Sequence, residues 1–137
     1  MLDTAMFTLT RGIAALFVLA GLSCGAASAQ DSPDGAELYR NYCSACHGAT
    51  GEGDGPVAGV MQVTVPNLRT LAMRSGGRFP TDAVTAYIDG TRIPLAHGSR
   101  QMPIWGDVFL WDDEGASVER AEQRIAAIVD YLMVLQH

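Results

Sequence analysis

The 137-residue chain carries nine arginines, no lysine and fifteen acidic side chains, which give a formal net charge of −6 at pH 7. Nucleic acid is not expected as a partner, because no basic stripe is available to displace counterions from phosphate. The length suits a single domain with one core.

The N-terminal segment has the layout of a secretory signal peptide. Arg11 precedes an uninterrupted apolar run of 11 residues, 12–22, and a small-x-small sequence ends at Ala29. A spanning helix needs about 20 apolar residues, so we predict export with cleavage after Ala29. An uncleaved membrane anchor and lipidation at Cys24 remain as alternatives. Removing residues 1–29 of the 137 leaves a domain of 108 residues, 30–137, whose charge stays at −6 because one acid and one base are lost together.

The first helix of this domain is predicted to begin at Ser32-Pro33-Asp34 and to run into Cys46. The hydroxyl of Ser32 can cap the helix, Pro33 fits the first helical position, and the Asp34 carboxylate faces the positive end of the helix dipole.

This helix leads into the segment Cys43-Ser44-Ala45-Cys46-His47. In a helix, two thiols and an imidazole at this spacing leave one face within about one turn. The pattern is typical of covalent haem c attachment, in which the thiols form thioethers with the haem vinyl groups and the histidine takes an axial position on the iron. We therefore predict that Cys43 and Cys46 bind one haem c covalently and that His47 is an iron ligand.

Two other uses of a Cys-x-x-Cys sequence are less favoured. A thioredoxin-type dithiol opens a helix after a buried strand, whereas the residues before Cys43 have a helical, polar pattern. A zinc site needs about four ligands, and the only other cysteine, Cys24, lies in the segment expected to be removed.

Residues 48–66 form a glycine-rich segment that we predict to be an irregular loop around the histidine side of the haem. A phosphate-binding loop is not indicated, because no strand precedes it and no Gly-Lys-Ser/Thr sequence closes it.

Two short helices are predicted next. Asn67 can cap the first, which runs to about Arg74 and ends at Gly76-Gly77. Thr81 is expected to cap the second and Gly90 to end it. Its predicted buried stripe consists of Val84, Tyr87 and Ile88.

Residues 92–111 contain prolines, glycines and two tryptophans without a sustained period, which predicts an ordered loop over the other haem face. Met102 lies at its centre, and its thioether is a soft ligand that favours ferrous iron. Met61, Met73 and His97 are alternative ligands.

Three further side chains of this segment are candidates for the haem propionates. Trp105 could donate its indole N–H to a propionate, although packing against the ring is an equally good use of it. Arg92 and Arg100 could pair with the propionates, since a buried carboxylate needs a partner; solvation is the alternative for both.

The last predicted helix begins near Ser117 and has apolar residues at i, i+3, i+4 and i+7. These positions are Val118, Ala121, Ile125, Ile128, Val129, Leu132 and Leu135. With no internal repeat and no second haem motif, we predict an all-α single domain of about four or five helices around one haem.

Four blocks between about residues 34 and 136 occur in an order that resembles the class I c-type cytochromes, small all-helical proteins with one haem ligated by histidine and methionine. The blocks are Gly35-x-x-x-Tyr39-x-x-x-Cys43-x-x-Cys46-His47-Gly48, Pro66-Asn67-Leu68, Met102-Pro103-x-Trp105-Gly106 and Tyr131-Leu132.

The resemblance implies roles for several residues. The carbonyl of Pro66 would accept the second ring N–H of the axial histidine, and Met102 would be the sixth ligand. Gly35 would allow the first helix to cross closely over the last, near Tyr131.

The function implied by the resemblance is one-electron transfer in the bacterial periplasm, not catalysis, because a six-coordinate iron offers substrate no open position. The chain would act as a diffusing carrier or as the cytochrome subunit of a dehydrogenase or oxidase complex. The alternative is a peroxidase-like haem enzyme or a haem-based sensor with a labile sixth ligand. The acidic charge predicts redox partners with a basic or apolar docking surface, and the mature form is expected to have no membrane span.

Overall fold

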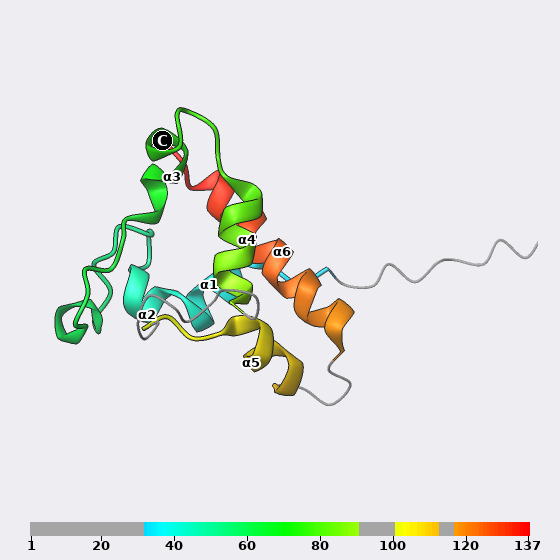
Figure 1. Ribbon diagram of the computed structural model, residues 1–137. Coiled ribbons are helices and arrows are strands. Elements are labelled where there is room, and N and C mark those ends of the chain that lie inside the picture. The colour runs from blue at the N-terminus through cyan, green and yellow to red at the C-terminus, as the bar shows by residue number, and fades with distance from the viewer. Residues whose placement is uncertain (1–31, 91–100, 113–116) are drawn as a thin grey trace, which may run out of the picture.

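The computed structural model describes residues 32–90, 101–112 and 117–137, and within these ranges it is built of helices without a strand. Figure 1 shows the helices gathered around the long C-terminal one. The α-helices are α1 (Gly35–Tyr42), α2 (Ser44–His47), α3 (Leu71–Arg74), α4 (Thr81–Asp89), α5 (Trp105–Trp111) and α6 (Val118–Val134); the 3-10 turns are η1 (Ala58–Val60) and η2 (Leu68–Thr70). The predicted all-α class is confirmed.

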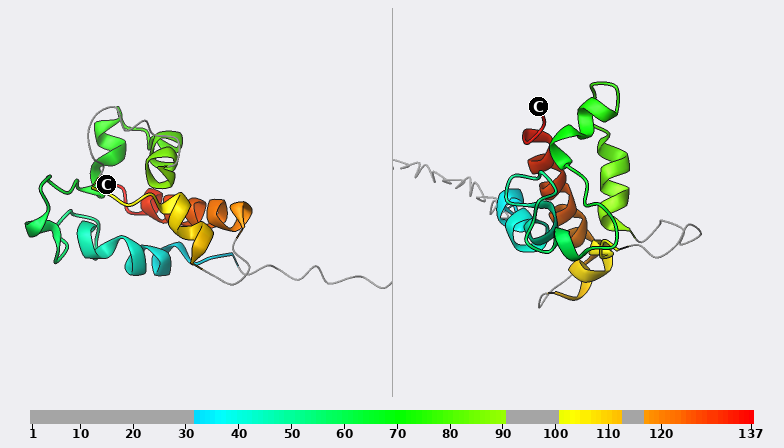
Figure 2. Two further views of the ribbon diagram at one scale, coloured as in Figure 1. Left: turned by 60° about the horizontal axis from the view of Figure 1, so that its bottom comes forward. Right: turned by 90° about the vertical axis from the view of Figure 1, so that its left-hand side faces the viewer.

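Helix α6 is the centre of the fold and contacts α1, α4 and α5. The right-hand view of Figure 2 shows it between α1 and α4. Its buried residues repeat at intervals of three and four and form one apolar face, which consists of Ala121, Ile125, Ile128, Val129 and Leu132. Most of the predicted stripe is therefore confirmed, but Val118, in the first turn, is 57% exposed.

The crossing of α1 over α6 depends on Gly35. A Cβ atom at this position would lie 2.0 Å from the carbonyl oxygen of Ala127 and 3.1 Å from the Cβ of Tyr131. One turn further on, the rings of Tyr39 and Tyr131 lie 5.2 Å apart between centroids. The close approach that the resemblance implied at Gly35 is confirmed.

The N-terminus of α1 differs in detail from the prediction. Asp34 is the N-cap, and its Oδ1 accepts hydrogen bonds from the backbone N–H groups of Ala36 (2.8 Å) and Glu37 (3.2 Å). Ser32, which was expected to cap, lies outside the helix. A carboxylate satisfies the free N–H groups and also interacts with the helix dipole, so it is the stronger cap here.

The segment between the haem motif and residue 90 follows the prediction closely. Asn67 caps the first short helix by accepting a hydrogen bond from Arg69 N at 2.8 Å, and Gly90 ends α4 in a left-handed conformation. Two details are wrong: Thr81 is the first helical residue without a side-chain cap, and Tyr87 is 53% exposed.

Helix α5 lies where an ordered loop without helical periodicity was predicted. Its buried residues Gly106 and Phe109 face the core. Phe109 lies 5.1 Å from the Tyr42 ring and 5.7 Å from the Trp105 ring between centroids. This three-ring contact joins α5 to α1, and it stabilises a helix too short for its period to be recognised in the sequence.

None of the helices within the described ranges is both long enough and apolar enough to span a bilayer. The predicted signal peptide, Cys24, Arg92, His97 and Arg100 lie outside the described residues.

Candidate cofactor site

The Cys-x-x-Cys-His segment continues the first helix after a local distortion. Cys43, between α1 and α2, has φ −116° and ψ −35°. The helical hydrogen bonds nevertheless continue through it, since Cys43 N donates to Tyr39 O and His47 N donates to Cys43 O, both at 2.9 Å. The two thiols and the imidazole therefore project from about one turn of near-continuous helix, as the spacing requires.

The thiol of Cys43 is buried, and its pKa is raised. It is 9% exposed, and burial, assisted by the neighbouring Cys46, raises its pKa to about 12. Reactive dithiols of the thioredoxin kind have a lowered pKa, because the thiolate is the nucleophile. Cys43 does not have this property, whereas a buried, protonated thiol is compatible with a position against an apolar macrocycle.

The imidazole of His47 is oriented by the backbone of a distant segment. Its Nδ1 lies 3.3 Å from the carbonyl oxygen of Pro66, so the N–H at this position donates to Pro66. Burial lowers the pKa of His47, and the Pro66 hydrogen bond opposes this in part. A neutral imidazole protonated on Nδ1 carries its lone pair on Nε2, which is the form that binds iron. These two groups are the pair that the resemblance implied; their role beside a haem stays a prediction.

The loop after His47 folds back over the end of α2. The N–H groups of Gly53, Gly55 and Val57 donate to the carbonyl oxygens of His47 (2.8 Å), Cys46 (3.2 Å) and Ala45 (3.0 Å), respectively. These are the carbonyls that a helix end leaves unsatisfied. The loop therefore completes α2 and fixes the thiol-bearing turn against its surroundings.

A small residue is required where this loop touches the helix. A Cβ atom on Gly55 would lie 2.4 Å from the Ala45 carbonyl oxygen and 2.6 Å from that of Cys46. The glycine-rich composition of residues 48–59 thus has a steric cause at Gly55, where two backbone segments meet.

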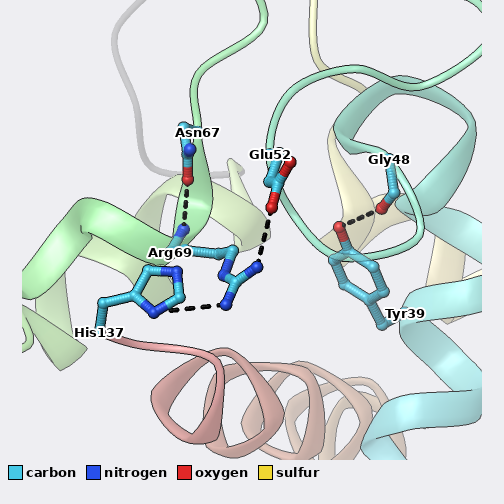
Figure 3. Close-up of polar contacts among 6 residues, drawn as sticks. All are labelled: Tyr39, Gly48, Glu52, Asn67, Arg69 and His137. Atoms are coloured by element: carbon cyan, nitrogen blue, oxygen red, sulfur yellow. Dashed lines mark hydrogen bonds and ion pairs between the residues drawn. The ribbon is translucent and has the colours of Figure 1, made fainter.

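The segment that carries Pro66 is bonded to the loop after His47, and the start of that loop is bonded to α1. Leu68 N donates to Gly51 O at 2.7 Å, and the buried hydroxyl of Tyr39 donates to Gly48 O at 2.7 Å. Figure 3 shows the hydrogen bond from Tyr39 to Gly48. Tyr39, which the resemblance placed in its first block, therefore anchors the start of the loop from α1.

Met102 lies just before α5, half-buried against the hydrophobic core. The preceding residue joins this segment to the loop after His47: Gln62 N donates to Gln101 Oε1 at 3.2 Å, and Gln101 Nε2 donates to Gln62 Oε1 at 3.3 Å. Of the two rival methionines, Met73 is 66% exposed and Met61 is half-buried. The role of Met102 as an iron ligand stays a prediction.

Trp105 opens α5 and packs in the three-ring contact with Tyr42 and Phe109, with its ring centroid 5.4 Å from that of Tyr42. Its predicted hydrogen bond to a haem propionate stays a prediction. Sequence reasoning missed Tyr42 and Phe109, although the position of Tyr42 directly before Cys43 offered a signal. It also missed the Gln62–Gln101 pair, because no pattern in the sequence indicates that these two residues meet.

The donor set fits a haem. Two buried or half-buried thiols, a neutral imidazole held by a carbonyl and a half-buried thioether are the ligand types that c-type haem uses. Together with the helical fold, they define the chain as a c-type cytochrome.

The comparison with protein families supports this class. Residues 30–118 match the family described as cytochrome c oxidase, cbb3-type, subunit III. The chain belongs to this family. Neither the curated proteins nor the solved structures yielded a match.

Proposed function

We propose that residues 30–137 form an exported cytochrome with one haem c, which transfers single electrons with both axial positions filled. Cys43 and Cys46 would hold the haem through thioethers, and His47 and Met102 would ligate the iron. Membership of a cytochrome c family supports haem-based electron transfer. The number of haems, the ligand pair and the cellular location are our own inferences.

When bound, the haem supplies an iron that alternates between the ferric and ferrous states. The chain's own residues provide attachment, orientation and exclusion of water. Pro66 O fixes the Nδ1 proton of His47 and so directs the lone pair of Nε2. Met102 would supply a soft thioether ligand that favours the ferrous state. With both positions filled, electron transfer is favoured over substrate chemistry.

The single observation that carries the proposal is the contact between His47 Nδ1 and Pro66 O at 3.3 Å. It spans 19 residues and fixes one tautomer of a histidine that directly follows two cysteines. A dithiol oxidoreductase would not need this orientation of the ring. A zinc site would use the same orientation, but the described residues contain no group of three or more histidine, cysteine or acidic side chains that could hold a metal ion.

Covalent attachment is tested by replacing Cys43→Ala and Cys46→Ala together. We expect the haem of the double variant to extract into acidic organic solvent, while the haem of the unmodified protein stays with the polypeptide. The extraction is read from the absorption of both phases. Equal extraction from the two proteins would contradict thioether attachment.

Export is supported by the apolar run at residues 12–22 and by the start of the family match at residue 30. We expect the mature protein to begin at Gln30. Its intact mass after expression in a bacterial host with haem c maturation would show this, and a mass that includes residues 1–29 would support an uncleaved anchor.

A further inference from the structure

The last two residues of the chain bind the segment that carries Pro66. The Gln136 side chain donates from Nε2 to the carbonyl oxygens of Leu68 (2.9 Å) and Leu132 (2.7 Å). Its Oε1 accepts from the backbone N–H of Ala72 at 2.9 Å. In addition, His137 N donates to Arg69 O at 3.3 Å.

A primary amide is the only side-chain group that satisfies all three partners of Gln136. Two carbonyl oxygens require two donors, and one N–H requires an acceptor, which matches the NH2 and C=O of a single amide. The side chain is half-buried, so an unpaired carbonyl or N–H here would be costly. Gln136 therefore joins the end of α6 to both η2 and α3.

Leu68 connects this contact to the imidazole. Its carbonyl accepts from Gln136, its N–H donates to Gly51 O at 2.7 Å, and it lies two residues after Pro66. The carbonyl of Pro66 in turn accepts from His47 Nδ1 at 3.3 Å. A short run of backbone thus lies between the amide of Gln136 and the ring of His47.

Arg69 makes a second, weaker side-chain contact between the end of the chain and the segment after Pro66. Figure 3 shows the Arg69 guanidinium between Glu52, at 2.8 Å, and the ring of His137, at 3.3 Å. The Glu52 side chain is 48% exposed, and exposed ion pairs contribute little. Among the described residues, Gln136 is thus the main polar contact between the chain that follows α6 and this segment.

We propose that Gln136 is a positioning residue: it holds the Pro66 carbonyl against His47 and thereby tunes the electron donation of the imidazole to the iron. This inference rests on the proposed haem ligation by His47. A ring N–H bonded to a carbonyl makes histidine a more basic ligand, and a more basic ligand stabilises the more positive ferric ion. Loss of the Gln136 amide should therefore raise the reduction potential.

The test compares Gln136→Met, which keeps the size but removes the polar atoms, with Gln123→Met. Gln123 is an exposed glutamine of α6, the helix that Gln136 follows, so its replacement is the control. Each haem-loaded protein is examined by redox titration and by NMR measurement of solvent exchange at the His47 ring N–H in the ferrous state. For Gln136→Met we expect a higher potential and roughly tenfold faster exchange; Gln123→Met should change neither.

A purely structural role would lower the thermal stability of Gln136→Met without changing the potential or the ring exchange, and that result would overturn the proposal. Gln136→Glu is the second variant, used in the same way if Gln136→Met does not accumulate. Its carboxylate can still accept from Ala72 but opposes two carbonyl oxygens, so both measurements should again change. Absence of covalent haem in the unmodified protein would instead refute the proposed function, which keeps the two failures distinct.

Discussion

At the scale of single residues, the site depends on backbone atoms as much as on side chains. The imidazole of His47 is oriented by a carbonyl, and the turn that bears the thiols is completed by three backbone N–H groups of the following loop. Such contacts need close approach, and therefore residues without a Cβ atom where two backbones meet. Gly55 is the clearest instance.

Gly55→Ala should loosen this loop. The new Cβ would meet backbone oxygens of Ala45 and Cys46 at 2.4 Å and 2.6 Å, so the loop must shift and its hydrogen bonds to α2 weaken. We expect the free energy of unfolding to fall by about 1–3 kcal/mol, measured by denaturant titration of the haem-loaded protein. Gly59→Ala is the matched control, since a Cβ there has no atom within 4 Å; an equal loss in both variants would contradict this account.

Residue-level predictions from sequence succeeded where local chemistry decides the outcome. Asn67 caps its helix, Gly90 ends α4, and α6 begins directly after Ser117, as predicted. They failed where two neighbours competed for one role. Asp34 caps α1 in place of Ser32. Gln136 gave no signal, because its three partners are defined only by the packing of distant elements.

At the scale of elements, the crossing of α1 and α6 sets the position of the haem motif relative to the core. Both helices are anchored there by Gly35 against Ala127 and by Tyr39 against Tyr131. The motif follows α1 directly, so any displacement of that helix moves Cys43 and His47 as well.

Gly35→Ala should displace α1 from α6. Its Cβ would lie 2.0 Å from a backbone oxygen of α6, which cannot move away as a side chain can. Ala is the better helix former by about 1 kcal/mol, and overpacking costs about 1–3 kcal/mol, so we expect a net decrease in stability despite the better propensity. Thermal unfolding measured beside Gly59→Ala checks this; an increase in Tm for Gly35→Ala would show that the crossing is not close in solution.

The long elements could be predicted and the short ones could not. Helix α6 has 17 residues and a sustained apolar period, so its existence and face were evident in the sequence. Helix α5 has seven residues between Pro103 and Asp112 and contains a glycine. Its stability comes from the contact of Phe109 with Tyr42 and Trp105. More than sixty residues of chain separate Phe109 from Tyr42. The hydrophobic periodicity of seven residues does not reveal a contact with a distant part of the chain.

At the scale of the whole molecule, charge is the property that bears most directly on partners. The chain has a net charge of −6 without any lysine, and two haem propionates would add to it. Long-range attraction of a positively charged partner accelerates encounter and is screened by salt.

We therefore expect electron transfer with a small basic redox protein to slow as ionic strength rises. The screening length falls from about 30 Å at 0.01 M to about 10 Å at 0.1 M, so stopped-flow rates over this range should decrease steadily. An acidic redox protein of similar potential is the control and should show the opposite trend. A rate with the basic protein that increases with salt would argue against docking by charge attraction.

We propose an iron ligated by His47 and Met102, and this ligand pair would determine both the reduction potential and the role as an electron carrier instead of an enzyme. The weak far-red absorption of the oxidised protein, which reports a bond between methionine sulfur and ferric iron, tests it most directly. We predict that the unmodified protein, Met61→Ala and Met73→Ala retain this band and that Met102→Ala loses it. Loss of the band in Met73→Ala with retention in Met102→Ala would contradict the account, as would a native protein that lacks the band altogether.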